Sequence, residues 1–192
     1  MSFTEEDFSE QVFEALEQRG LVLKDKHFEA CTFRRCNFGG ASFARSRFVG
    51  GAFENCDLSN LQLQGASLRD VSFRNCKLMG VNWAMSSSVA HLNFEDCVLD
   101  LSAFVGLDLR KSVFRNCRAR EADFADANLS EANCQGTDFT GARFSRTNLT
   151  KADFRRALNY TIRPDDNKLK KARFSLPEAT LLLYGLDIEL EE

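Results

Sequence analysis

Residues 28–63, FEACTFRRCNFGGASFARSRFVGGAFENCDLSNLQL, carry a large apolar side chain at every fifth position. The series continues without a gap from Phe28 to Trp83, and the residue two places before each large one is mostly small, as at Cys31 and Ala41. Neither the two-residue period of a strand nor the 3.6-residue period of an amphipathic helix fits this spacing. A fixed internal period of this kind predicts a repeat architecture.

A second series of the same kind starts one residue out of step after Trp83. Steps of five from Phe94 to Phe154 meet large apolar residues everywhere except at Ala119 and Cys134. The segment between the two series, residues 84–93, adds one residue to the repeat count, so it predicts a register break. A bulge is one form that this break can take, in a break loop made of Met85, Ser86, Ser87 and Ser88.

A longer period shows how many steps make one coil. The pattern Phe-x-x-Cys begins at Phe33, Phe53, Phe73, Phe94 and Phe114, at intervals of 20, 20, 21 and 20 residues. Four five-residue steps therefore make one coil, and the interval of 21 falls at the register break. If coils stack about 4.8 Å apart, as paired strands do, residues 20 apart are direct neighbours in a column.

Charge alternates along one of these columns, which predicts a ladder of ion pairs on one side. Each exposed pair is worth only about 0.2 to 1 kcal/mol, so the main effect is on the register between coils. The column runs through Glu14, Arg34, Glu54, Arg74, Glu95, Arg115, Gln135 and Arg155.

The five-residue unit resembles that of the pentapeptide-repeat family, roughly Ala-(Asp/Asn)-(Leu/Phe)-x-x, as in Ala122-Asp123-Phe124 and Ala152-Asp153-Phe154. The resemblance covers about Phe8 to Phe174. It implies an all-β solenoid, a right-handed quadrilateral β-helix, in which the large residue and the small residue two places before it point inward. Residues 1–174 are expected to form this β-helix, and residues 175–192 a separate C-terminal module.

The N-terminus allows two interpretations. Phe8 and Phe13 share the first register, so coiling is expected to start near residue 8, with Gln18 as a defective step. The same residues could instead form one side of a short helix together with Val12 and Leu16. Acidic side chains near this end discourage edge-to-edge stacking of a β-helix.

The C-terminal module has a different pattern. Residues 162–167 predict a turn, after which Leu169 and Phe174 return to register. Ser175-Leu176-Pro177-Glu178 has the spacing of a capping box, which predicts a short helix to Tyr184, ended by Gly185. The alternation at residues 186–190 predicts a strand.

This module carries more apolar surface than one solenoid end is expected to cover. A symmetric end-to-end homodimer would bury the surplus, whereas the alternative is a cap that folds back on its own chain. The predicted dimerisation residues are Leu181, Leu182, Tyr184, Leu186, Ile188 and Leu190.

Few residues offer chemistry. His27 and His91 are the two histidines, and neither lies in a motif with a nucleophile or a metal ligand, so neither an enzyme nor a cofactor or metal site is expected. Six of the seven cysteines occupy the small inward position and are expected to fill the interior, with metal or redox work as the alternative. Five of them are expected to stack in one column: Cys36, Cys56, Cys76, Cys97 and Cys117.

The bulk composition is that of a globular chain, with 44% hydrophobic residues and a formal net charge of −3. No apolar run of about 18 residues is present, and the acidic start differs from a secretory or transit signal. We therefore expect a cytoplasmic protein with reduced thiols and no membrane contact. No phosphate-binding glycine loop is found and basic residues alternate with acidic ones, so neither a small-molecule substrate nor direct nucleic-acid binding is expected.

Within the family, the chain is most similar to the topoisomerase-protecting group, which includes the quinolone-resistance (Qnr) and albicidin-resistance proteins. The similarity is carried by residues 171–179, residues 186–190 and the segment Cys76 to Trp83. It implies a dimeric, negatively charged rod that mimics DNA, binds DNA gyrase, and counters gyrase poisons such as quinolones or albicidin-like toxins. The candidate gyrase-facing carboxylates, for which plain solubility is the alternative role, are Asp100, Asp108, Glu121, Asp123, Asp126, Asp138 and Asp153.

Two departures from that group are visible. Residues 28–83 hold seven Lys or Arg and four Asp or Glu, so any mimicry of DNA is expected nearer the C-terminus. The break adds only one residue, where protective members often have a projecting loop, so binding without drug protection is left open. A structural or scaffold protein that binds another partner is the competing hypothesis.

Overall fold

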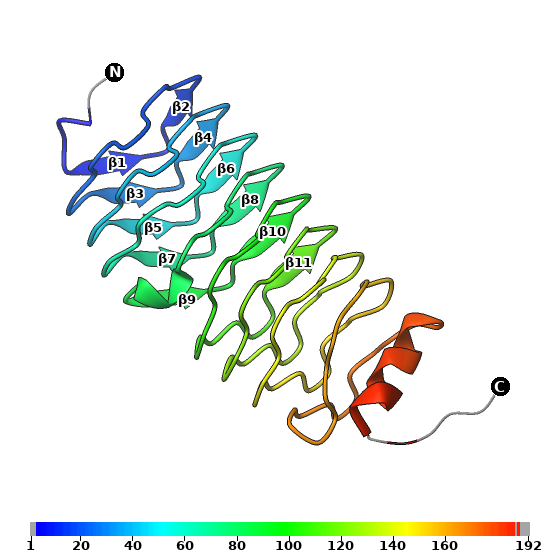
Figure 1. Ribbon diagram of the computed structural model, residues 1–192. Helices are drawn as coiled ribbons and strands as arrows, with labels where there is room; N and C mark the ends of the chain where they lie inside the picture. The colour runs from blue at the N-terminus through cyan, green and yellow to red at the C-terminus, as the bar shows by residue number, and fades with distance from the viewer. Residues whose placement is uncertain (1–2, 187, 189–192) are drawn as a thin grey trace.

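The computed structural model describes residues 3–186 and 188, which wind into a four-sided rod of stacked coils (Figure 1). Side 1 contains β1 (Asp7–Ser9), β3 (His27–Glu29), β5 (Arg47–Val49), β7 (Ser67–Arg69) and β9 (Ser88–Ala90). Side 2 contains β2 (Val12–Glu14), β4 (Thr32–Arg34), β6 (Ala52–Glu54), β8 (Ser72–Arg74), β10 (Asn93–Glu95) and β11 (Val113–Arg115). Isolated parallel bridges join the coils on side 3, as between Asn37 and Asp57, and on side 4, as between Ser42 and Gln62.

The register between coils confirms the 20-residue turn. All strand pairs are parallel, and Phe53 lies opposite Phe73, 20 residues on. Across the break the offset is 21, with Phe73 opposite Phe94. Bridges continue the sides toward the C-terminus, side 1 through Asn128, Asn148 and Lys168, and side 2 through Asn133, Asp153 and Arg173. The chain is thus the right-handed quadrilateral β-helix that the resemblance to the pentapeptide-repeat family implies.

The interior is filled by columns of stacked rings. Phe33 and Phe53 have ring centroids 4.6 Å apart and planes 8° apart, and Phe104 and Phe124 are 4.9 Å and 3° apart. Trp83 is fully buried against the edges of neighbouring rings. Each five-residue step therefore contributes one large side chain to a continuous core.

The small inward residues bind the backbone of the previous coil. The Cys76 thiol donates to the carbonyl of Phe53 at 3.3 Å, and the Ser102 hydroxyl donates to that of Leu78 at 3.0 Å. All seven cysteines are free and buried, and the predicted five-membered column is present within the core. Burial raises the pKa of the thiols of Cys31 and Cys134, which keeps them protonated.

The N-terminal coil interpretation is confirmed and the helical alternative is wrong. β1 and β2 pair with the next coil in register, and Val12 is exposed rather than buried beside Phe8 and Phe13. Phe3 packs on this first coil, with its ring 5.1 Å from that of Phe13.

The register break contains one turn of 3₁₀ helix, η1 (Trp83–Met85), instead of a projecting loop (Figure 1). The Asn82 side chain accepts the backbone N–H of Ala84 at 3.1 Å, which caps this turn. Ser87 then donates its backbone N–H to Ala66 of the previous coil, so the inserted residue is absorbed within a few positions.

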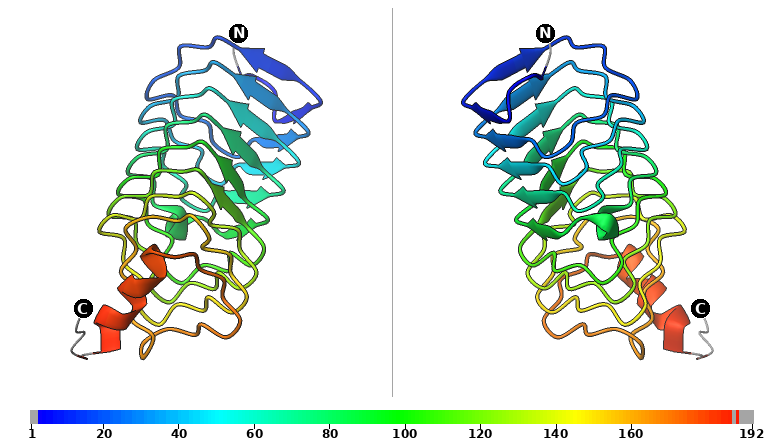
Figure 2. Two further views of the ribbon diagram at one scale, coloured as in Figure 1. Left: turned by 90° about the vertical axis from the view of Figure 1, so that its right-hand side faces the viewer. Right: turned by 90° about the vertical axis from the view of Figure 1, so that its left-hand side faces the viewer.

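The C-terminal coil follows the prediction, but the helix after it differs. The turn lies at residues 164–166, and Lys168 pairs with Asn148 as the return to register requires. The predicted capping box is wrong, because the Ser175 hydroxyl accepts the backbone N–H of Arg156 at 2.8 Å instead of capping a helix. The helix is η2 (Glu178–Leu186), a 3₁₀ helix that lies obliquely at the end of the stack (Figure 2).

Gly185 lies inside η2 and does not end it, which corrects the sequence prediction. A Cβ atom at this position would lie 3.0 Å from Pro164 and 3.2 Å from the Cα of Arg163. The glycine therefore allows η2 to approach the final turn closely. The predicted strand at residues 186–190 falls mostly outside the described residues, and Leu186 itself belongs to η2.

Candidate interaction surface

His27 is half-buried on side 1, and His91 is exposed at the corner that follows β9. His27 Nδ1 is 3.2 Å from Asp7, and His91 Nδ1 is 2.9 Å from Asp70. Within residues 3–186 no group of His, Cys, Asp or Glu is arranged to hold a metal ion. In the same part of the chain, no helix has the length and apolarity needed to cross a bilayer. The features that remain for recognition are the outward side chains of the four sides.

The predicted charge ladder on side 2 is present in part. Arg34 Nε is 2.9 Å from Glu54, and Glu95 is 2.6 Å from Arg115 and 3.7 Å from Arg74. At its N-terminal end the ladder differs from the prediction. Glu14 binds Arg35 at 2.7 Å instead of Arg34, because the corner residue also reaches it.

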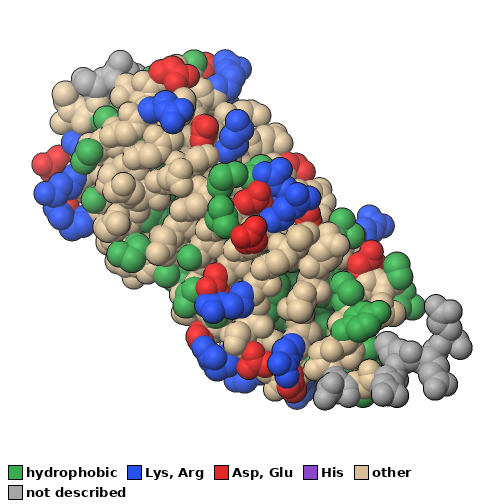
Figure 3. Space-filling model, viewed as in Figure 1, with side chains coloured by type: hydrophobic (Ala, Val, Ile, Leu, Met, Phe, Trp, Pro, Cys, Tyr) green, Lys and Arg blue, Asp and Glu red, His purple; other side chains and the backbone are tan. Residues whose placement is uncertain are grey.

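The seven candidate carboxylates are distributed over all four sides rather than in one column. Side 3 carries Asp100 and Asp138, side 4 carries Asp123, and Glu121 and Asp126 lie at the two corners of side 4. Asp108 is on side 1 and Asp153 on side 2. Figure 3 shows acidic and basic side chains side by side on the face that it displays.

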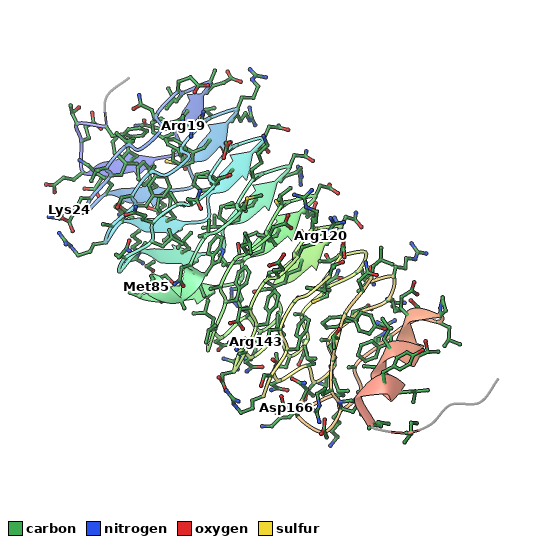
Figure 4. The ribbon with its side chains drawn as sticks, viewed as in Figure 1. Arg19, Lys24, Met85, Arg120, Arg143 and Asp166 are labelled. Atoms are coloured by element: carbon green, nitrogen blue, oxygen red, sulfur yellow. The ribbon has the colours of Figure 1, made fainter. Side chains whose placement is uncertain are left out.

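Six of the seven carboxylates are bound by arginine, so they contribute little net negative charge. The shortest distances are 2.7 Å for Asp100 with Arg118, 2.7 Å for Asp108 with Arg110, 2.6 Å for Asp123 with Arg143, 2.7 Å for Asp126 with Arg146, 2.8 Å for Asp138 with Arg120, and 2.7 Å for Asp153 with Arg155. Glu121 has no ion-pair partner among the residues that the structure describes. Figure 4 places Arg120 and Arg143 on different sides of the stack.

Two of these carboxylates are held strongly in the charged form. Burial opposes ionisation of Asp153, but hydrogen bonds from Arg155 and Gln135 outweigh it and lower the pKa of Asp153 to about 2. Burial also opposes ionisation of Asp138, and hydrogen bonds from Asn159, Thr140 and Arg120 likewise lower its pKa below the usual range. Both are structural anchors between coils as well as surface groups.

The sequence prediction missed these arginine partners. Arg143 and Arg146 lie 20 residues after Asp123 and Asp126, so the 20-residue period could have identified them. Arg118 lies only 18 residues after its partner Asp100, a spacing that the period does not predict.

The predicted dimerisation residues separate into two groups. Leu181 and Leu182 are half-buried and pack on the core of the last coil. Tyr184 is 73% exposed, and Leu186 and Ile188 are also exposed. Leu190 lies outside the described residues. The end of the rod therefore combines a cap on its own core with an apolar surface that faces outward.

The break loop lies beside a surface hollow. Met85 is 47% exposed, whereas the Ser88 hydroxyl is bound to that of Ser67 at 2.9 Å. Next to it, a hollow of about 280 Å³ is lined by β9 residues and by His91, Asp108, Arg110 and Lys111. Asp108 thus lies near the break.

Two family models match the chain, one of the pentapeptide repeat region over residues 26–104 and one of pentapeptide repeats in eight copies over residues 117–156. Together they cover more than half of it. The chain belongs to the pentapeptide-repeat family.

Solved structures of the family show the same fold. A trypsin-treated variant of QnrB1, a plasmid-mediated fluoroquinolone resistance protein, matches with a TM-score of 0.72 and 18% identity, over 97% of this chain and 99% of that one. HetL, involved in heterocyst differentiation regulation in the cyanobacterium Nostoc sp. strain PCC 7120, matches with a TM-score of 0.70 and 17% identity, over 90% of this chain and 88% of that one. Among curated proteins, none has a sequence that matches this chain. At these identities the likeness is one of fold.

Proposed function

We propose that this protein is a non-catalytic binding protein of DNA gyrase that changes the response of gyrase to quinolones or albicidin-like toxins. The supporting observation is that the fold matches a fluoroquinolone resistance protein along the whole rod, over 97% of this chain and 99% of that protein. A rigid rod of stacked coils offers gyrase a long, preformed surface, so little conformational entropy is lost on binding.

The pairing of acidic with basic side chains limits how much charge alone can contribute to the proposed binding of gyrase. A surface that competes with DNA only by charge needs unpaired carboxylates, whereas here six of the seven candidates are bound to arginine. In the proposed complex, the width and rigidity of the rod and its patterned hydrogen-bonding groups carry most of the recognition. Glu121 is the candidate carboxylate left to meet a basic side chain of gyrase.

The gyrase proposal is tested with a DNA supercoiling assay and a direct binding measurement. We expect the protein to bind purified gyrase and to inhibit supercoiling at high dose or to restore it in the presence of a quinolone or albicidin. Because few bare charges are involved, we expect the affinity to fall less than tenfold between about 50 and 200 mM salt. No complex, no inhibition and no rescue would together overturn the proposal.

A matched pair of charge-reversal variants tests whether gyrase binds at the surface around Glu121. Glu121→Lys reverses the charge of the unpaired carboxylate, and Glu10→Lys makes the same change at an exposed left-handed corner near the other end of the rod. Lysine occurs at such corners already, as at Lys111. We expect Glu121→Lys to weaken gyrase binding about fivefold and Glu10→Lys to leave it unchanged.

We further propose that two copies associate through the exposed part of the C-terminal module. Tyr184, Leu186 and Ile188 provide apolar surface that the chain itself leaves in water. Sedimentation equilibrium should give twice the chain mass of 21.7 kDa for the natural protein and the single mass for a Tyr184→Asp, Leu186→Asp double variant. Leu101→Asp is the control, since it exchanges an exposed leucine in the middle of the rod. A natural protein that sediments as a monomer would leave the module as a cap only.

A scaffold or regulatory role with another partner is the alternative, supported by the likeness in fold to HetL, which is involved in heterocyst differentiation regulation. Capture of a specific partner other than gyrase by the immobilised rod, with no effect on supercoiling, would favour this alternative.

A further inference from the structure

The sign of the charge reverses toward the C-terminal end of the rod. Residues 84–138 contain nine Asp or Glu and five Lys or Arg, whereas residues 139–174 contain ten Lys or Arg and three Asp or Glu. The alternation expected along the chain therefore stops before the last coils. Residues 175–192 then contain five Asp or Glu and no Lys or Arg, so this excess of positive charge is confined to residues 139–174.

The excess cations gather on two adjoining sides. Lys168 continues side 1 and Arg173 continues side 2, and both are in the last coil. Lys170 and Lys171 lie between them at the corner. Lys151 lies one coil earlier and donates its backbone N–H to the carbonyl of Lys170 at 2.9 Å. We call the following group the basic end: Lys151, Arg155, Arg156, Lys168, Lys170, Lys171 and Arg173.

Carboxylates compensate only part of the basic end. Asp153 is shared by Arg155 at 2.7 Å and Arg173 at 3.4 Å, and Lys151 is 3.4 Å from Glu131. The other four cations have no ion-pair partner within the described part of the chain: Arg156, Lys168, Lys170 and Lys171. All four are exposed. The unpaired charges here are basic, whereas six of the seven candidate carboxylates described above are ion-paired with an arginine.

A hollow lies beside these cations on side 2. Its volume is about 310 Å³, and it is lined by Gln135, Arg155, Arg156 and Ser175. The Ser175 hydroxyl accepts the backbone N–H of Arg156, which fixes this backbone while the Arg156 guanidinium has no carboxylate to bind. Arg155 already binds Asp153, so it is the Arg156 guanidinium that suits a phosphate group at this hollow, which arginine binds in a bidentate manner.

We propose that the basic end binds the phosphate backbone of double-stranded DNA without regard to sequence. Lysine and arginine on a rigid surface make the phosphate contacts that position a protein on a duplex. Phe174 follows Arg173, but its ring packs against those of Phe154 and Tyr160 on the core, so it does not offer the stacking platform of a single-strand binder. Asn148 and Thr150 lie next to the lysines on side 1 where a membrane-binding surface would need bulky apolar residues. This inference does not depend on gyrase binding.

The test is fluorescence anisotropy of a labelled duplex of about 20 base pairs, titrated with the full-length protein. If four phosphates are contacted, the salt slope is about −3.6, so the affinity falls roughly 10²-fold between 50 and 200 mM salt. We expect a Lys168→Gln, Lys170→Gln, Lys171→Gln triple variant to bind at least tenfold more weakly at low salt, with a slope reduced by about three.

A matched control separates the basic end from net charge. Arg47→Gln, Arg69→Gln and Lys77→Gln remove three exposed cations from earlier coils, with the same change in net charge. We expect this control to retain the affinity of the natural protein, and urea titration should show that both variants are folded. Equal losses in the two triple variants, or no duplex binding at low salt, would overturn the proposal. Binding to phosphatidylserine vesicles without binding to the duplex would overturn it as well and assign the basic end to a membrane.

Discussion

Phe73→Ala removes one ring from the middle of the aromatic column on side 2, and we expect it to lower the free energy of unfolding by about 4 kcal/mol. The ring is 2% exposed and stacks between Phe53 at 5.2 Å and Phe94 at 5.1 Å. It also meets the edge of Trp83 at 5.6 Å. Three ring contacts at about 0.5 to 1.5 kcal/mol each place the loss in the upper part of the range for a buried phenylalanine.

Two controls make this expectation specific. Phe73→Leu keeps most of the volume and should cost only about 1 kcal/mol. Phe8→Ala removes a ring from the first coil. This ring stacks on Phe28 at 4.9 Å and has no second stacked ring among the described residues, so its cost should be about half that of Phe73→Ala.

The assay is urea denaturation followed by far-ultraviolet circular dichroism, combined with native-state hydrogen exchange. Phe73 and Phe94 face each other across the register break, so their contact couples the two halves of the rod. In a repeat protein, stability is close to a sum of coil and interface terms. Amides near the break should therefore lose protection before those of the terminal coils. A loss of less than about 1 kcal/mol, or one no larger than that of Phe8→Ala, would refute this account of the core.

Three further predictions concern single groups. The pKa of Asp153 is lowered to about 2 from its ordinary value of 3.8, so its ion pair stabilises the protein by up to about 2 kcal/mol above pH 4 and loses this contribution as the pH falls toward 2. The stability difference between the natural protein and Asp153→Asn, measured by urea titration, should therefore shrink between pH 4 and pH 2. The buried thiols, Cys76 among them, should react with Ellman's reagent at pH 8 only as fast as the chain unfolds, and rapid reaction of the native protein would contradict the packing role. Cys134→Phe restores a large residue to its repeat position but should destabilise the protein by about 1 to 3 kcal/mol. The reason is that the Phe139 ring, 5.5 Å from Phe154, already packs across this part of the core. A rise in melting temperature would contradict this prediction.

The repeat pattern determined the architecture because each step buries its own large and small residue within five positions. The coil length, the register break and the cysteine column all follow from where apolar residues recur along the chain. They are confirmed by the offsets of 20 and 21 residues between paired coils. Nearest-neighbour stacking leaves few alternatives, so a one-dimensional pattern is enough to predict it.

The details of the surface and of the C-terminal end depended on the tertiary structure. Glu14 binds Arg35 and not Arg34, since a long charged side chain reaches several partners of similar energy. Gly185 is required by the close approach of the turn at Pro164, which no local pattern reveals. Leu182 lies against the last coil while Tyr184 faces outward, and only the path of η2 decides which of these side chains is buried. The sequence alone thus determined the stacking of coils, and the tertiary structure decided the charge pairing and the exposed end, because these depend on contacts between segments that share no repeat.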